Sequence, residues 1–170
     1  ISALQPVRAT GVWDKVGQTW STSATDAPEP VSSLVLEPID LPENAASITF
    51  TLSHQVHLEE GLGGNVKLST DGGQTWDVLE PEGGYGATFA ASDAHPMNGQ
   101  PVFSGSTGST VQAQFNLSAY AAQQLRLRID FGATRAIDGS EFWRIQDALF
   151  TFSLATQEEQ FEIPRELALH

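Results

Sequence analysis

Few residues in this 170-residue chain have the types and spacing that catalysis requires. His54 and His57 lie three positions apart, but the zinc-peptidase motif His-Glu-x-x-His needs a helix. On a strand, residues three apart face opposite sides, so these two histidines cannot readily share one ion and are expected to be surface or packed residues. Serine is common, yet no Gly-x-Ser-x-Gly sequence marks a nucleophile elbow. These patterns predict that the chain is not itself an enzyme.

The acidic residues offer a different chemistry. The chain has 21 Asp and Glu against 8 Lys and Arg, and a formal net charge of −13. Glu59 and Glu60 are adjacent, so on a strand they would point apart and could not form the facing carboxylate pair of a glycosidase. In a loop, both could reach a calcium ion, which prefers oxygen ligands. The acidity would equally keep a secreted protein soluble, and it argues against nucleic acid as a partner because phosphate backbones would be repelled.

Aromatic side chains provide a third chemistry, the binding of sugars. An exposed aromatic ring can stack on the C–H groups of a sugar while polar neighbours hold the hydroxyls. Three aromatic residues near the N-terminus and in a long loop are the candidates: Trp13, Trp20 and Tyr85. For each of them, packing at the edge of the core is the alternative. Trp143 and Tyr120 are expected to be packed residues.

The segment LSTDGGQTWDVL, at 68–79, looks like the Asp box, Ser-x-Asp-x-Gly-x-Thr-Trp, which recurs in sialidases and other secreted β-proteins. Asp71 can accept backbone N–H groups across a turn. Gly72 and Gly73 can adopt positive φ angles, and the Trp76 indole can pack over the end of the hairpin. Each residue has a structural role, so the box predicts one hairpin turn and no sugar chemistry.

The elements around these residues read as strands. Apolar and polar residues alternate with period two, and in the run at 125–131 all charges fall on one face. The apolar phase shifts near Asp147, which predicts a β-bulge in the last strand. Ser118 could cap one helical turn. Many strands separated by turns indicate a sandwich or barrel. Strands are expected at 8–13 and 32–36 (both at sheet edges), 47–53, 65–68, 75–79, 111–117, 125–131 and 142–154.

Three further features of the sequence limit the chemistry and organisation expected of the protein. Cysteine is absent, which excludes disulfides and thiolate chemistry, and no apolar run is long enough to enter a bilayer as a span. The stretch at 80–110 is long and irregular, so it is expected to be functional or mobile. With the loop at 59–64, the part at 83–109 would carry any ligand contacts. The chain starts at Ile1 without a signal peptide, so we expect an excised domain or a processed form.

Taken in order along the chain, several segments resemble the MAM-like jelly-roll domains that accompany immune-inhibitor-A-type metallopeptidases and other secreted bacterial hydrolases. The matching segments include EEGLGGNVKLSTDGG and FWRIQDA and lie at 34–41, 59–73, 115–121, 125–128 and 142–148. The resemblance implies an all-β, two-sheet antiparallel jelly-roll β-sandwich over residues 1–154 with a non-catalytic role. It also implies structural calcium, for which Glu59, Glu60 and Asp147 remain. Gly63 and Gln146 replace two acids that family members often carry.

The C-terminal segment has a resemblance of its own. IPRELALH, at 163–170, looks like the stretch just before the C-terminal sorting domain of the type IX secretion system. It implies that 155–170 is a linker leading to a sorting domain that the sequence does not include. An ordinary acidic linker is the alternative.

The sequence therefore predicts an accessory or binding domain of a larger secreted or cell-surface bacterial protein, whose activity is that of a hydrolase. Its expected partners are a glycan or protein surface and other domains of the same parent chain. The alternative function is a carbohydrate-binding module that recognises a polysaccharide, and a small hydrolase is the third and weakest interpretation.

Overall fold

The computed structural model describes residues 2–154. The predicted linker and sorting-domain boundary at 155–170 lies outside the described residues. One 3₁₀ turn, η1 (Ser118–Tyr120), accompanies the strands. The strands are β1 (Ser2–Ala3), β2 (Pro6–Ala9), β3 (Trp13–Val16), β4 (Thr19–Thr22), β5 (Val31–Leu36), β6 (Ile39–Asp40), β7 (Ala45–Leu58), β8 (Leu62–Ser69), β9 (Asp77–Leu79), β10 (Ala87–Thr88), β11 (Pro101–Val102), β12 (Gly105–Ser106), β13 (Val111–Asn116), β14 (Gln124–Ala133) and β15 (Phe142–Leu154).

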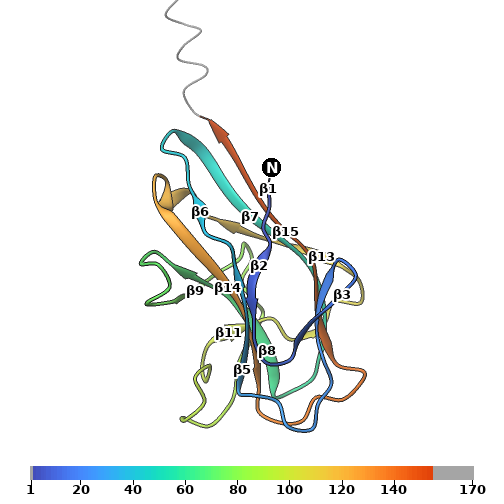
Figure 1. Ribbon diagram of the computed structural model, residues 1–170. Coiled ribbons are helices and arrows are strands. Elements are labelled where there is room, and N and C mark those ends of the chain that lie inside the picture. The colour runs from blue at the N-terminus through green and yellow to red at the C-terminus, as the bar shows by residue number, and fades with distance from the viewer. Residues whose placement is uncertain (1, 155–170) are drawn as a thin grey trace, which may run out of the picture.

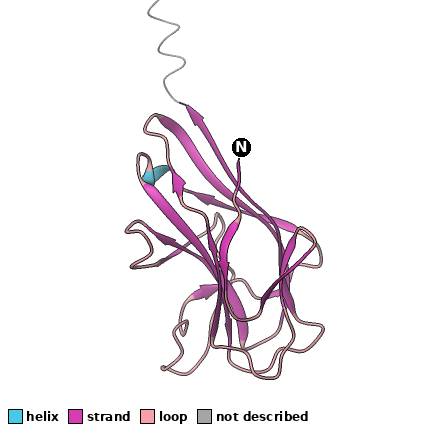
Figure 2. Cartoon of the chain, in the orientation of Figure 1, coloured by secondary structure: helices cyan, strands magenta, loops and turns pink. Residues whose placement is uncertain are grey.

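Two antiparallel sheets pack face to face (Figures 1 and 2). The first, here called the β7 sheet, runs β12-β7-β15-β4-β3, with β13 also on β7 and β1 also on β15. The second, the β14 sheet, runs β2-β5-β14-β8-β9, with β6 also on β14. The chain crosses repeatedly between the sheets, for example from β4 to β5, β6 to β7, β7 to β8, β13 to β14 and β14 to β15. This alternation makes the predicted jelly-roll β-sandwich. Among the described residues, no helix has the length and apolarity needed to cross a membrane.

The period-two pattern produces these layers. In β14, Leu127 and Ile129 face the core, whereas Arg126, Arg128 and Asp130 face outward, as the charge pattern predicted. The core between the sheets is rich in large aromatic and aliphatic side chains with less than 2% of their surface exposed, among them Trp143, Phe50, Phe115, Phe131, Leu34, Ile48, Leu52 and Leu125. Trp143 is therefore the core residue that was expected.

The local predictions fare differently. The bulge in the last strand is confirmed, because the β15–β7 register shifts between Ile145 and Asp147. A single strand at 8–13 is wrong: the chain turns at Gly11, where φ is +62° and a Cβ would meet Ser32 Oγ at 2.1 Å. The segment at 32–36 belongs to β5, an interior strand between β2 and β14.

The predicted helical turn exists, but Ser118 does not cap it. Ser118 is the first residue of η1, and its Oγ accepts a hydrogen bond from the backbone N–H of Ile48 at 3.0 Å. The side chain therefore fastens η1 to the start of β7. The Ser118 prediction fails because a tertiary donor captures the hydroxyl that local rules assign to the cap.

The long segment after β9 covers part of the outer face of the β14 sheet. Phe89, Met97 and Val102 form a small buried cluster there. A Cβ on Gly132 would lie 2.9 Å from both Met97 and Phe89, so only glycine allows this close approach. The segment at 80–110 was expected to be functional or mobile. In the structure, Phe89, Met97 and Val102 of this segment pack against the β14 sheet.

Gly64 supports a stability prediction. A Cβ at this position would lie 2.1 Å from Trp143 and 2.7 Å from the Asp130 carbonyl oxygen. Gly64→Ala is expected to lower the free energy of unfolding by roughly 1–3 kcal/mol, because a well-packed core must shift to admit the methyl group. Urea unfolding measures the change. Gly17→Ala is the control, since no atom lies within 4 Å of its Cβ position, although its φ of +64° makes a small backbone cost expected there. Equal costs in the two variants would contradict the packing argument.

Candidate functional site

The Asp box forms the predicted turn between β8 and β9. Asp71 Oδ1 accepts the backbone N–H groups of Gln74 (3.1 Å) and Thr75 (2.9 Å), and Oδ2 accepts the Thr75 hydroxyl (2.6 Å). These bonds, first that of the Thr75 hydroxyl, hold the pKa of Asp71 well below its usual range. Gly72 and Gly73 have φ angles of +76° and +95°. The structural role of all these residues is confirmed.

Trp76 completes the turn as expected. Its indole N–H donates to the Gly73 carbonyl at 3.1 Å, and the Arg128 guanidinium lies 4.5 Å from its ring centroid. A cation over an indole face is a favourable arrangement. The box therefore fixes an indole beside an arginine on the outer face of the β14 sheet, a contact with a distant strand that the motif alone does not specify.

The three carboxylates proposed for calcium do not come together. Glu59 and Glu60 lie at the turn between β7 and β8, whereas Asp147 pairs with Ser53 in the middle of the β7 sheet. Six residues of extended chain separate Ser53 from Glu59, a span of about 20 Å. Within residues 2–154, no group of three or more His, Cys, Asp or Glu residues could hold a metal ion. These acids do not fit a single calcium site.

An arginine stabilises the turn near Glu59 instead. Arg135 forms a two-point ion pair with Glu141, with N–O distances of 2.9 and 2.7 Å, and donates to the Glu60 carbonyl at 2.9 Å. Glu141 also accepts the backbone N–H of Glu59 at 3.2 Å. Hydrogen bonding to Arg135 lowers the pKa of Glu141 from 4.5 to about 2. The positive charge near this turn is therefore supplied by Arg135, which pairs with Glu141.

Two of the three candidate sugar-binding aromatics are buried. Trp13 is 6% exposed, lies 5.5 Å from the Trp143 ring centroid, and donates its indole N–H to the Ser32 carbonyl. Tyr85 is 8% exposed, and its hydroxyl bonds to the backbone of Val66 and Leu79. Neither ring offers a free face to a ligand, so the packing alternative holds for both.

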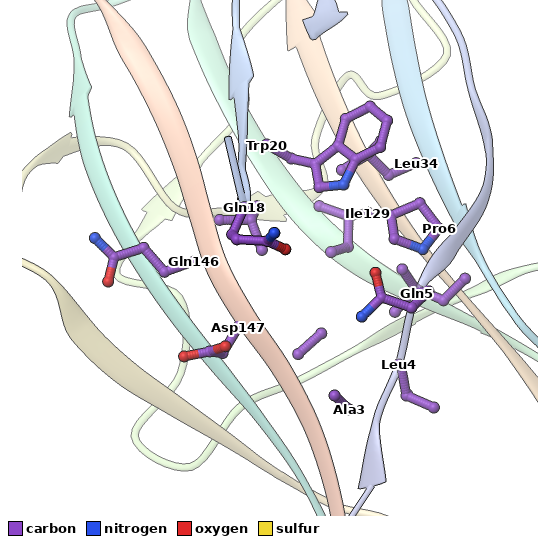
Figure 3. Close-up of a pocket in the computed structure, with 13 residues that line it drawn as sticks. Ala3, Leu4, Gln5, Pro6, Gln18, Trp20, Leu34, Ile129, Gln146 and Asp147 are labelled. Carbon is purple, nitrogen blue, oxygen red and sulfur yellow. The ribbon is translucent and has the colours of Figure 1, made fainter. Parts of the chain in front are cut away.

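Trp20 has different surroundings. It is half-buried in β4 and lines a pocket of about 210 Å³ at the edge of the sandwich. Apolar residues from both sheets form the inner wall, and the chain from β1 to β2 closes one side. The lining comprises Ala3, Leu4, Gln5, Pro6, Gln18, Trp20, Leu34, Leu36, Ile129, Ile145, Gln146, Asp147 and Ala148. Figure 3 shows Trp20, Gln5 and Pro6 turned toward one space in front of Ile129.

The polar groups of this pocket are unused. Within the described residues, the Trp20 indole N–H has no hydrogen-bond partner, whereas Trp13, Trp76 and Trp143 all have one. The side-chain amides of Gln5 and Gln18 likewise lack partners in the described part of the chain, and both lie beside Trp20 in Figure 3. The pocket therefore combines an aromatic ring with one free N–H donor and two amides that can each donate and accept.

The acidic member of the lining points elsewhere. Asp147 and Gln146 sit in the β-bulge, and in Figure 3 their side chains lie on the side of β15 away from Trp20. Their backbone contributes to the wall, while the Asp147 carboxylate is not aimed into the space. The pocket as a whole is uncharged on its inner side, which suits a neutral ligand with hydroxyl groups.

Trp20 was a candidate from the sequence, whereas Gln5 and Gln18 were not. Gln5 and Gln18 lie in short segments without periodic pattern, and no motif distinguishes them from other exposed amides. They meet Trp20 only because β1 pairs with β15 and β4 pairs with the same strand.

No protein-family model matches the sequence, and no curated protein matches it. Solved structures of similar fold include TmCBM61 in complex with β-1,4-galactotriose, at 14% identity over 86% of this chain and 88% of that one, with a TM-score of 0.47. The xyloglucanase domain of NopAA from Sinorhizobium fredii, in complex with cellobiose, matches at 8% identity over 88% and 100%, with a TM-score of 0.46. Infectious bursal disease virus, Gx strain, matches at 13% identity over 91% and 33%, with a TM-score of 0.43.

Proposed function

We propose that this chain is a glycan-binding module whose Trp20 pocket holds a neutral sugar unit. The observation that carries the proposal is the free indole N–H of Trp20 beside two free amides in an otherwise apolar hollow. Sugars present apolar C–H faces and hydroxyl groups together, so they need both kinds of contact at once. A ligand hydroxyl would satisfy polar groups that the described residues leave unpaired.

The volume of the pocket limits the size of the sugar that can enter it. Its volume of about 210 Å³ lies below the range of about 300–1,000 Å³ typical of drug-sized ligands. We infer that one sugar ring enters, as a chain end or a side branch, while the rest of a polysaccharide lies outside.

The sequence resemblance suggests what kind of parent protein contains this module. We propose that the module is a non-catalytic part of a larger secreted or cell-surface protein with hydrolase activity, and that it holds this protein to its substrate. Incubation with oligosaccharides followed by product analysis tests this part, since released sugars would contradict it.

Substitution of Trp20 tests the pocket directly. Trp20→Ala is expected to weaken glycan binding by about 30-fold, equivalent to about 2 kcal/mol, because tryptophan contacts are among the strongest in binding sites. Isothermal titration calorimetry with β-1,4-galactotriose, cellobiose and xyloglucan oligosaccharides provides the measurement.

Two amide variants control for the structural role of Trp20, which also packs against the core. Gln18→Ala removes an exposed pocket amide and should weaken binding several-fold without changing stability. Gln123→Ala removes an exposed amide outside the pocket lining and should leave affinity unchanged. Binding that persists at full strength in both Trp20→Ala and Gln18→Ala would refute the proposed site.

A further inference from the structure

A second pocket lies on the outer face of the β14 sheet, beside the Asp box. It has a volume of about 460 Å³, and its lining includes Arg8, Trp76, Arg126 and Arg128. Three of the chain's eight Lys and Arg residues thus line one hollow, although the formal net charge is −13. Such a concentration of cations in an acidic chain marks a local region of positive charge.

Arg126 and Arg128 point away from the core, and Arg128 is held in place by neighbouring side chains. Arg126 and Arg128 alternate with core residues along β14, so both leave the sheet on its outer face. Arg128 is fixed by its Nη2–H hydrogen bond to Asp130 Oδ2 at 2.9 Å and by its position over the Trp76 ring. The floor of the pocket is therefore preorganised, which lowers the entropic cost of binding a ligand.

Among the described residues, the arginines of this pocket form ion pairs with one carboxylate, that of Asp130. Asp130, which is 1% exposed, is the shared partner of Arg128 and of buried Lys67, whose Nζ lies 2.7 Å from Oδ2. One carboxylate thus serves two cations. Arg126 Nε is buried without a hydrogen-bond partner among the described residues, and the ion pairs of these residues include neither Arg126 nor Arg8.

Two nearby carboxylates, Asp71 and Glu37, form no ion pair with the pocket arginines in the described structure. Asp71 keeps its negative charge, but its oxygens accept the N–H and hydroxyl groups of its own turn and form no ion pair with an arginine of the described residues. Glu37, two residues beyond Val35 and just past the end of β5, accepts the backbone N–H of Gln5 at 3.2 Å, and no ion pair joins it to Arg126 in the described structure. No hydrogen bond joins the Arg126 side chain to the described residues, so the terminal nitrogens of its guanidinium are available to a ligand carboxylate.

The geometry points to a carboxylate-bearing sugar as the ligand: we propose that this pocket binds a hexuronate, with Arg126 and Arg8 pairing its carboxylate and Trp76 contacting its ring. Guanidinium groups match a planar carboxylate through paired N–H bonds. A long polyanion would meet the negative charge of the rest of the chain, whereas a single carboxylate would not. The proposal is independent of the Trp20 pocket, which lies between the sheets and shares no lining residue with this one.

NMR titration of the ¹⁵N-labelled protein tests the proposal through the Trp76 indole N–H resonance, which Trp76→Phe assigns. Galacturonate is expected to shift this resonance, while galactose, its neutral counterpart, is not. Arg126→Gln should weaken galacturonate binding about tenfold or more, and Arg8→Gln should weaken it less because Arg8 is exposed. Raising the NaCl concentration should weaken binding further in the unmodified protein.

Control variants distinguish this site from general charge attraction and from the Trp20 pocket. Arg144→Gln removes an arginine that lies over Phe142 on the other sheet and should leave galacturonate affinity unchanged. Trp20→Ala should also leave it unchanged, so failure of one site is distinguishable from failure of the other. The proposal is overturned if galacturonate leaves the Trp76 resonance unmoved, if galactose binds equally well, or if inorganic sulfate or phosphate binds more tightly than galacturonate. Unchanged resonances of Trp13 and Trp143 in Arg126→Gln would show that this variant is folded.

Discussion

Lowering the pH from 7 to 4 is expected to reduce the free energy of unfolding by about 3 kcal/mol through His54 alone. This side chain is 1% exposed, and burial lowers its pKa from 6.5 to about 4. Its Nδ1 accepts the indole N–H of buried Trp143 at 3.0 Å, which requires an unprotonated nitrogen at that position. One pKa unit corresponds to about 1.4 kcal/mol, which sets the size of the effect.

The direction follows from where the proton binds. Below pH 6.5 the unfolded chain protonates His54, whereas the folded protein stays neutral there until about pH 4. Stability is therefore complete above pH 6.5, falls as the pH drops toward 4, and stops falling through this group below that. Glu141 acts in a lower window, because its stabilisation is present above pH 4.5 and is lost as the pH falls toward about 2.

Urea unfolding at pH 7, 6, 5 and 4 measures this dependence. His54→Gln is the matched variant, because its amide oxygen can accept the Trp143 N–H and cannot titrate. The variant is expected to lose most of the stability change between pH 7 and pH 4, whatever its stability at pH 7. An identical pH dependence in both proteins would show that His54 is not the responsible group.

Asp130→Asn is expected to cost about 3–5 kcal/mol of folding free energy. The carboxylate accepts hydrogen bonds from Lys67 (2.7 Å), Arg128 (2.9 Å) and the Ser33 hydroxyl (2.7 Å). Lys67 is 5% exposed, and burial lowers its pKa while Asp130 raises it. Removing the negative charge would leave a buried ammonium beside a guanidinium with no counter-charge, which is the costly way to break an ion pair.

The control for this change is Asp40→Asn, also on a strand bonded to β14 but exposed. Its carboxylate accepts one hydrogen bond from Gln124, which an asparagine oxygen can also accept. This variant should stay within about 0.5 kcal/mol of the parent in urea unfolding. Were Asp130→Asn equally mild, the Lys67–Asp130–Arg128 cluster would not be a stabilising feature of the sheet.

The sequence by itself determined much of the local structure. Period-two alternation places Leu127 and Ile129 inside and Arg126 and Arg128 outside, because neighbouring side chains on a strand must point to opposite faces. The Asp box likewise specifies its own turn, since Asp71 bonds to residues only three and four positions away. These local rules indicated an all-β sandwich or barrel, and the resemblance of the ordered segments implied the two-sheet jelly-roll.

Only the tertiary structure decided which residues are available to ligands. Alternation assigns a side chain to a face, but it does not say what covers that face. Trp13 and Trp20 therefore look alike in the sequence, yet Trp13 meets Trp143 in the core while Trp20 meets the open side of the β1–β2 segment. The contact between Lys67 and Asp130 spans 63 positions and depends on the register of β8 with β14.

The difference between local pattern and tertiary contact also explains why the predicted calcium ligands do not converge. Glu59, Glu60 and Asp147 are plausible together when only residue types are considered, because carboxylates suit calcium wherever they gather. Asp147 pairs with Ser53, several residues before the turn after β7 that contains the two glutamates. Asp147 therefore lies far along the strand from Glu59 and Glu60. A binding site requires side chains to converge in space, and that convergence depends on strand pairing between residues far apart in the chain.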